Sequence, residues 1–460
     1  MDRRPPRPPT SESGSSVLDP ADVEDLSPEE RRRRIKLVGD PPEADPEPIS
    51  DGSAGRSWRE KREGRRTERI RRFWSFMEGG NPHTNYWLVL GGTLALTAIG
   101  LTMVLSSSAV DSFGASGSAF TLFIRQASWA VIGLIGMLVV SRIPVRWMGG
   151  IGWVLMIVSG VLLALVAFTP LGHEVNGSRN WIQLGPINGQ PSELAKLGLV
   201  LWGSAVLARK GRLVHQFLHW MMPFVMPGTL FVLLMVLIGG DLGTSLIILL
   251  MAGILLFTAG VRMRYFLVAA GLALAAVVAL MWLTPYRMLR VYAWLGMNCE
   301  DVSDPCMQTQ HGFYALASGG FWGVGLGQSR QKWSYIPEVE NDFIFTIIGE
   351  ELGLLGTLLV LGLFALLTLG IFRIAATTEQ RFVRFACMGI AAWLVGQSFI
   401  NIAMVTGIIP VVGVPLPFIS YGGSALTCAL LGVGVVLNFA NAQRRRARTA
   451  PAERKKAATP

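Results

Sequence analysis

Residues 85–441 form one long apolar block in which stretches of roughly 20 apolar residues recur, the length that a transmembrane helix needs. In lipid, every backbone polar group must be hydrogen-bonded within the protein, which favours helices. Ten windows are suitable: 86–106, 120–141, 150–168, 191–208, 220–238, 241–258, 265–283, 353–372, 384–406 and 421–441. The sequence therefore predicts an all-α polytopic membrane protein with ten transmembrane helices.

The composition supports a membrane protein. Hydrophobic residues make up 51% and charged residues 16% of the 460 residues, whereas a soluble domain has about 25% charged residues. Only four cysteines occur, which excludes a disulfide-dense scaffold. Cys299 and Cys306 share a predicted outer loop, where an oxidising exterior permits a disulfide. The net charge of +10 fits the excess of cytoplasmic Lys and Arg in membrane proteins better than nucleic-acid binding.

The two ends of the chain are polar. Residues 1–84 hold 17 basic and 17 acidic residues, and residues 1–50 contain ten prolines, which predicts a disordered tail. Residues 56–72 carry nine basic and three acidic residues. This segment is either an amphipathic helix on the anionic inner leaflet or a solvated charged linker. Residues 442–460 form a second, basic tail with seven basic residues and one acid.

Charge in the loops orients the helices. An even number of spans places both termini on one side, and the loops 142–149, 209–219, 259–264 and 373–383 carry Arg and Lys. The opposite short loops contain only Arg179. Both termini are therefore expected in the cytoplasm. Residues 284–352 form a large outer loop between the seventh and eighth spans. Between the first and last spans, every acid except Glu379 falls in the outer half, so we expect carboxylate chemistry outside.

Ionisable residues within spans are costly and mark candidate sites. Glu193 and Lys196 are three residues apart on one helix face, so they can pair. Asp241 opens a span, where an acid can satisfy free backbone amides. Arg125 lies in the second span. These residues either have structural roles or line a polar cavity that is open to the outer leaflet and holds an anionic headgroup.

The sequence lacks the motifs of several common classes of binding site. It contains no P-loop, dinucleotide fingerprint or HExxH motif, and its scattered histidines form no metal-binding pattern. We therefore expect no metal site built from the protein's own residues and no nucleotide cofactor.

Three stretches carry a specific resemblance: NGSRNWIQLGPINGQPSELAKL at 176–197, WSYIPEVENDFIFTIIGEELGLLG at 333–356, and QSFINIAMVTGIIPVVGVPLPFISYGGSA at 397–425. They resemble the SEDS (shape, elongation, division and sporulation) family of polytopic membrane proteins over residues 85–441. Residues 315–345 resemble the cell-division type more than the elongation type. The long polar N-terminus and the two loop cysteines resemble actinobacterial versions.

The resemblance implies peptidoglycan glycosyltransferase activity on lipid II, a disaccharide-pentapeptide on an undecaprenyl-pyrophosphate carrier. It also implies that the protein acts in the bacterial plasma membrane, at the division septum. The expected partners are a class B penicillin-binding protein, which cross-links the strands, and other division proteins of the membrane.

The implied reaction inverts an anomeric carbon, so it needs a base for the acceptor hydroxyl and cations for the leaving pyrophosphate. Asp342, which matches the acid of the family's DFIF motif, is the expected general base. Arg179 is the first candidate for the headgroup, since a guanidinium binds phosphate oxygens in pairs. The remaining candidates for substrate binding are Arg125, Trp181, Glu193, Lys196, Asp241, Glu338 and Ser420. A divalent cation, Mg²⁺ or Mn²⁺, on the pyrophosphate would also suit this chemistry.

A lipid II flippase is the alternative function. Ten spans with buried charges also suit a transporter, which needs polar residues along the whole membrane depth. Here the ionisable residues gather in the outer half, which favours the polymerase.

Overall fold

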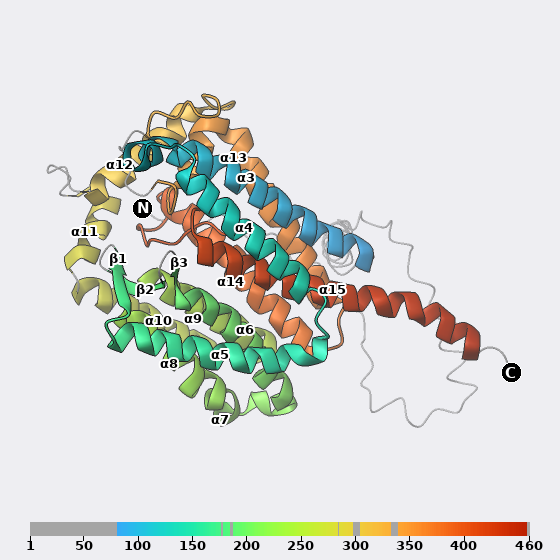
Figure 1. Cartoon of the computed structure of the whole chain (residues 1–460). Helices are drawn as coiled ribbons and strands as arrows, with labels where there is room; N and C mark the ends of the chain where they lie inside the picture. The colour runs from blue at the N-terminus through green and yellow to red at the C-terminus, as the bar shows by residue number, and fades with distance from the viewer. Residues whose placement is uncertain are drawn as a thin grey trace, which may run out of the picture. The chain divides into compact units, whose positions relative to one another are not determined.

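The computed structural model describes residues 81–175, 178–184, 187–283, 285–297, 304–332 and 339–457, which lie in one compact unit, Ile70–Pro460. The segment 56–72, Cys299 and Glu338 lie outside the described residues. The longer helices are α3 (Pro82–Ser116), α4 (Thr121–Val140), α5 (Val145–Phe168), α6 (Pro191–Lys210), α8 (Leu230–Ile238), α9 (Leu242–Ala259), α10 (Met263–Leu283), α11 (Pro285–Trp294), α12 (Asp304–Gly319), α13 (Ile344–Ala376), α14 (Arg381–Val405) and α15 (Gly423–Ala457) (Figure 1).

Eight helical segments of the described residues are long and apolar enough to cross a membrane. One of them joins the short α7 (Phe217–Trp220), the π-helical stretch η3 (Met221–Thr229) and α8. The two remaining predicted spans coincide with α6 and α10. Helix α6 is less apolar because it carries Glu193 and Lys196, yet it is buried almost throughout between Pro191 and Leu207. The chain is thus a mostly helical, multi-pass membrane protein.

A small sheet corrects the all-α prediction. Strands β1 (Gly172–Val175), β2 (Ser178–Leu184) and β3 (Ile187–Gly189) form an antiparallel sheet in the order β1-β2-β3, between α5 and α6. Figure 1 places it at the same end of the helices as α11. These strands are short and contain glycines, so they lack the long apolar run that identified the spans.

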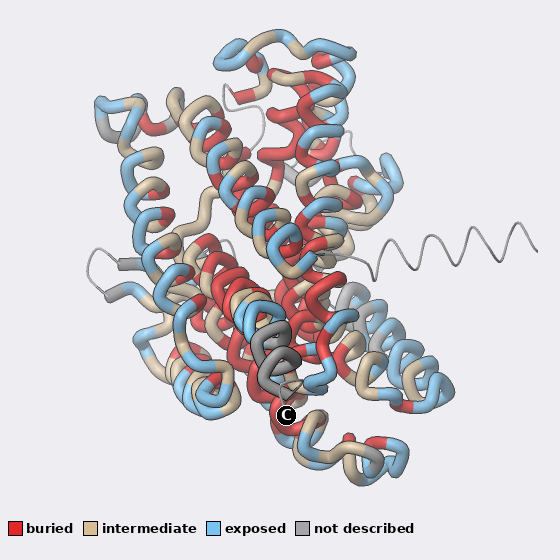
Figure 2. The backbone as a smooth tube through the Cα atoms, turned by 90° about the vertical axis from the view of Figure 1, so that its right-hand side faces the viewer, coloured by how far each residue is buried: buried red, intermediate tan, exposed pale blue. Residues whose placement is uncertain are grey.

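Helix α6 lies at the centre of the packing. Its Leu197, Val200 and Leu201 belong to one hydrophobic cluster with α3, α4, α13, α14 and α15. Its Leu199 and Trp202 belong to a second cluster with α5, α8 and α9. Figure 2 shows buried residues on the inner faces of the helices and exposed residues along the outer faces. The exposed outer faces are apolar, as the hydrocarbon core of a membrane requires.

Helix α13 is broken at Gly353, where φ is 65° and ψ is −163°. The break lies at the first residue of the predicted span 353–372. The break frees backbone groups that bond to the loop 320–332: Val324 N donates to Glu350 O at 2.9 Å, and Leu354 N donates to Gly320 O at 3.0 Å. The loop 320–332 is therefore hydrogen-bonded into the break.

The side chains of Glu350 and its neighbour Glu351 fasten this loop further. Glu350 accepts from Ser329 Oγ at 2.6 Å and from Arg330 N at 3.0 Å. Glu351 accepts from Ser106 Oγ of α3 at 2.6 Å and lies 3.9 Å from Lys332 Nζ. Both glutamates are 1% exposed, so their burial is compensated by these donors.

Candidate functional site

Residues 406–422, between α14 and α15, form a non-helical segment that we call the hub segment. Irregular backbone at membrane depth needs partners for its polar groups. Buried Asn401 of α14 supplies one: its Nδ2 donates to Val414 O at 2.7 Å and also to Asp342 O at 2.9 Å. Tyr421 N donates to Glu340 O at 2.8 Å. The hub segment and the residues before α13 are thereby fastened together.

Asp342 is partly buried just before the start of α13. A Cβ atom added to Gly413 would lie 3.4 Å from Asp342 Oδ2 and 3.7 Å from Arg290 Nη1 of α11. Gly413 has a φ of 72°, which favours glycine. The carboxylate of Asp342 and the guanidinium of Arg290 therefore flank the same backbone position of the hub segment.

The predicted pair of Glu193 and Lys196 is confirmed, with Lys196 Nζ 2.8 Å from Glu193 Oε1. Lys196 Nζ also donates to Gln397 Oε1 at 2.9 Å and lies 5.3 Å from the ring centroid of Trp393. Gln397 in turn donates to Pro415 O at 2.9 Å. A chain of hydrogen bonds thus connects α6, α14 and the hub segment.

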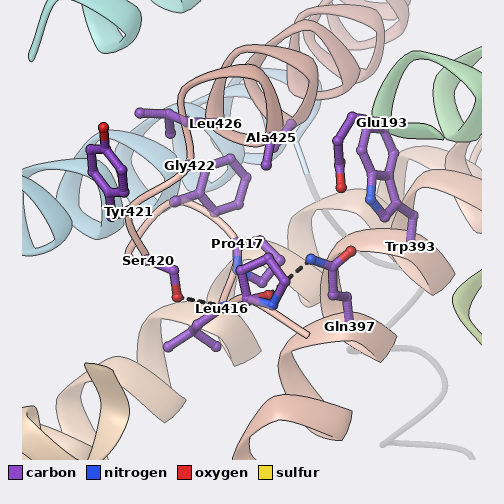
Figure 3. A pocket seen from close by; sticks show the side chains of 13 residues that line it. Glu193, Trp393, Gln397, Leu416, Pro417, Ser420, Tyr421, Gly422, Ala425 and Leu426 are labelled. Carbon is purple, nitrogen blue, oxygen red and sulfur yellow. Dashed lines mark hydrogen bonds between the residues drawn. The ribbon is translucent and has the colours of Figure 1, made fainter. Parts of the chain in front are cut away.

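A small cavity lies beside this chain (Figure 3). Glu193, Gln397 and Ser420 are among its lining residues, and its volume is about 10 Å³. That volume is near the minimum for one water molecule and is far too small for a sugar. Ser420 Oγ accepts from Leu416 N at 2.7 Å, which closes a turn in the hub segment. In this structure Ser420 therefore shapes the hub segment, and Glu193 lines the cavity beside it.

Asp241 occupies the N-cap position of α9, as the sequence predicts for an acid that opens a span. Its Oδ1 accepts from Thr244 N at 2.8 Å, and its Oδ2 accepts from Gln190 Nε2 at 2.9 Å. A Cβ atom at Gly243 would lie 3.0 Å from Val412 O. The start of α9 therefore packs closely against the hub segment.

Three other predicted site residues, Arg179, Trp181 and Arg125, lie apart from the residues around the hub segment. Arg179 is exposed on β2, and its guanidinium donates to Thr169 O at 2.6 Å and to Gly172 O at 3.3 Å. Trp181 is half-buried on β2 opposite His173 of β1. Arg125 is exposed on α4, whereas its neighbour Gln126 is buried and donates to Ser420 O at 3.1 Å.

Three residues that bond to the hub segment were not predicted as site residues: Arg290, Gln397 and Asn401. Gln397 and Asn401 are polar positions inside an apolar span, one turn apart, and this signal could have identified them. Arg290 gave no such signal because it lies outside the ten predicted spans. Within the described ranges, no three Asp, Glu, His or Cys side chains converge to hold a metal ion.

Comparisons with known proteins identify the family. Residues 86–445 match the family of FtsW, RodA and SpoVE, described as cell cycle proteins. The chain is 38% identical to "probable peptidoglycan glycosyltransferase FtsW" of Mycobacterium tuberculosis, over 78% of this chain and 68% of that protein. It is 40% identical to the protein of the same name from Coxiella burnetii, over 77% of this chain and 95% of that one.

A solved structure gives the same result. The chain resembles one from a study of the structural coordination of polymerization and crosslinking by a peptidoglycan synthase complex. The TM-score is 0.63 with 29% sequence identity, over 78% of this chain and 98% of that chain. With the family match covering most of its length, the chain belongs to the family of FtsW, RodA and SpoVE, the SEDS family.

Proposed function

We propose that this chain is a peptidoglycan glycosyltransferase that polymerises lipid II into glycan strands at the outer face of the plasma membrane. The names of the relatives support the reaction. The observation that carries the proposal is the placement of Asp342, a partly buried carboxylate that faces Gly413 of the hub segment and whose backbone is held by Asn401.

Asp342 acts as the general base. It takes the proton from the hydroxyl of the acceptor sugar while that oxygen bonds to C1 of the pyrophosphate-linked sugar. The bond from C1 to the pyrophosphate oxygen breaks, the leaving pyrophosphate keeps the electron pair, and the anomeric carbon inverts. Because Asp342 is only partly buried, the acceptor can reach it from outside the bundle.

Glu193, Lys196 and Asp241 help to position the hub segment, and Ser420 closes a turn within it. Arg179, Trp181 and the outer loop that includes Glu338 would guide the headgroup to the site. The phosphates of the substrate, rather than a protein ligand cluster, would hold any divalent cation.

The membrane topology that fits this reaction has ten spans, with α6 and α10 added to the eight that hydropathy identifies. Both termini are then cytoplasmic, and Asp342 is outside. A class B penicillin-binding protein is the proposed partner, and the division septum is the proposed site of action. The structural relative from a complex that couples polymerization and crosslinking supports such a partner.

Purified protein, combined with its class B penicillin-binding protein, should convert labelled lipid II into long glycan strands. Strand length on gels and cleavage of the product by a muramidase measure this. Translocation of lipid II across vesicles with no polymer in the same preparation would contradict the proposal and favour the flippase.

A further inference from the structure

The first half of the loop 320–332 exposes a group of large apolar side chains. They are Phe321, Trp322, Val324 and Leu326, and Trp322 is 77% exposed. The rings of Phe321 and Trp322 meet edge to face, with their centroids 5.2 Å apart. Single exposed apolar residues are common on proteins, whereas a contiguous group of them marks an interaction surface. We call these four residues the apolar patch.

Hydrogen bonds fix the backbone of the apolar patch to the break in α13. Leu355 N donates to Phe321 O at 3.4 Å, and Gly325 N donates to Glu351 O at 3.0 Å. Gly323 lies between these two contacts with a φ of 83°, and a Cβ atom there would collide with Glu351 O. Backbone atoms thus make the contact with α13, and the side chains of the patch stay exposed.

This contact places the apolar patch at the outer end of a membrane span. Leu355 is the third residue of the predicted span 353–372, and Leu354, Leu355 and Leu358 are themselves exposed. Apolar side chains that a spanning helix leaves exposed are suited to contact with lipid. The patch therefore continues the lipid-facing surface of α13 at the depth where headgroups meet acyl chains. Tryptophan is enriched at this depth, because its ring is apolar and its N–H is polar.

The second half of the loop has the opposite chemistry. Gln328 and Arg330 are exposed and polar. Ser329 and Lys332 are buried, and Ser329 Oγ donates to Glu350 Oε2 at 2.6 Å. The loop is therefore divided into an apolar half beside the start of the span and a polar half with exposed hydrophilic groups. Segments that lie in the membrane interface separate apolar from polar groups in this way.

We infer that the apolar patch inserts into the outer leaflet of the membrane, at the boundary between headgroups and acyl chains. The occupant of this surface is lipid, because the patch is continuous with the exposed leucines of α13. The backbone bonds between the loop and α13 then hold the outer end of this helix at a fixed depth. Asp342 lies two residues before α13, so the same anchor sets the depth of its carboxylate relative to the lipid surface.

The test measures the depth of a nitroxide spin label on the full chain, without partners, in nanodiscs of phosphatidylethanolamine and phosphatidylglycerol. The label is attached to Val324→Cys, which keeps both aromatic rings of the patch, or to Gln328→Cys as the matched control in the polar half. Oxygen concentrates in acyl chains, and a nickel chelate stays in water. We expect frequent oxygen collisions and a loss of nickel collisions at position 324, with the reverse at position 328. The unsubstituted chain, treated with the same label, gives the background from its own cysteines.

Two results at position 324 would overturn the inference. Nickel collisions as frequent as at position 328 would show that the patch faces water. Few collisions with either reagent would show that protein covers it, as a docking surface on a second copy of the chain would require. Leu326→Cys repeats the measurement at a second position of the patch if Val324→Cys does not fold. Adding the class B penicillin-binding protein should leave the oxygen collisions unchanged, and their loss would show that the occupant is this partner and not lipid.

Discussion

Asn401 donates a hydrogen bond of 2.9 Å to the carbonyl oxygen of Asp342, although the two residues are far apart in the sequence. The same Nδ2 also donates to Val414 O at 2.7 Å. One buried amide therefore fixes the backbone of the proposed base relative to the hub segment that faces it. A buried polar residue of α14 therefore holds the proposed active site through backbone carbonyl groups.

Replacement of Asn401 should reduce activity through the position of Asp342. Asn401→Ala leaves two buried carbonyl groups without this donor, at a cost of about 1–3 kcal/mol each at most. Asn401→Asp has the same shape but cannot donate, so it should be similarly impaired. We expect kcat to fall at least tenfold with little change in KM for lipid II. Ser398→Ala is the control, because this buried serine bonds only within α14, to Leu394 O at 2.7 Å. If Asn401→Ala is as active as Ser398→Ala, then Asn401 has no positioning role.

The pair of Glu193 and Lys196 should be strongly coupled. Lys196→Met leaves the carboxylate of Glu193 buried without its cation, and breaking such a pair costs about 3–5 kcal/mol. Glu193→Gln instead removes the negative charge of the pair. The double variant should be more stable than the sum of the single losses predicts, by about 0.5–3 kcal/mol. Reversible unfolding in mixed micelles measures the free energy of unfolding of each variant. Additive losses would mean that the 2.8 Å contact contributes nothing to stability.

Gly353 should not tolerate a side chain. Its φ of 65° with ψ of −163° is a conformation that essentially only glycine adopts. A Cβ atom there would lie 2.4 Å from Gly323 N. Gly353→Ala should therefore displace the loop 320–332 and lower the midpoint of thermal unfolding. Gly362→Ala, on the same helix with no atom within 4 Å of its Cβ position, should leave the midpoint nearly unchanged. A similar effect of both substitutions would show that the break in α13 is not a tightly packed joint.

The helices were predictable because hydrophobic length alone identifies a span. The pairing of Glu193 with Lys196 and the capping role of Asp241 followed from helix geometry, which depends on local spacing. The sheet was not predictable in this way, since its strands are only three to seven residues long. Hydropathy windows carry no information on the pairing of such short strands.

The site was predictable only where a residue had a local signal. Asp342 precedes a helix and matches a family motif, so the sequence proposed it as a candidate. Arg290 is brought near it by contact of α11 with the hub segment, and Asn401 by contact of α14 with the residue before α13. Spacing along the chain says nothing about these contacts. Arg179 was proposed for its guanidinium, and the sequence did not predict that this group also donates to the carbonyl groups of Thr169 and Gly172.

Strand formation by Asp342→Asn tests the central claim most directly. Labelled lipid II is supplied to wild type, Asp342→Asn and Glu340→Gln, each with the class B penicillin-binding protein. We predict long strands from wild type and Glu340→Gln and none from Asp342→Asn, which should still bind lipid II and its partner. Equal strand formation by Asp342→Asn and wild type would contradict the assignment of Asp342 as the base.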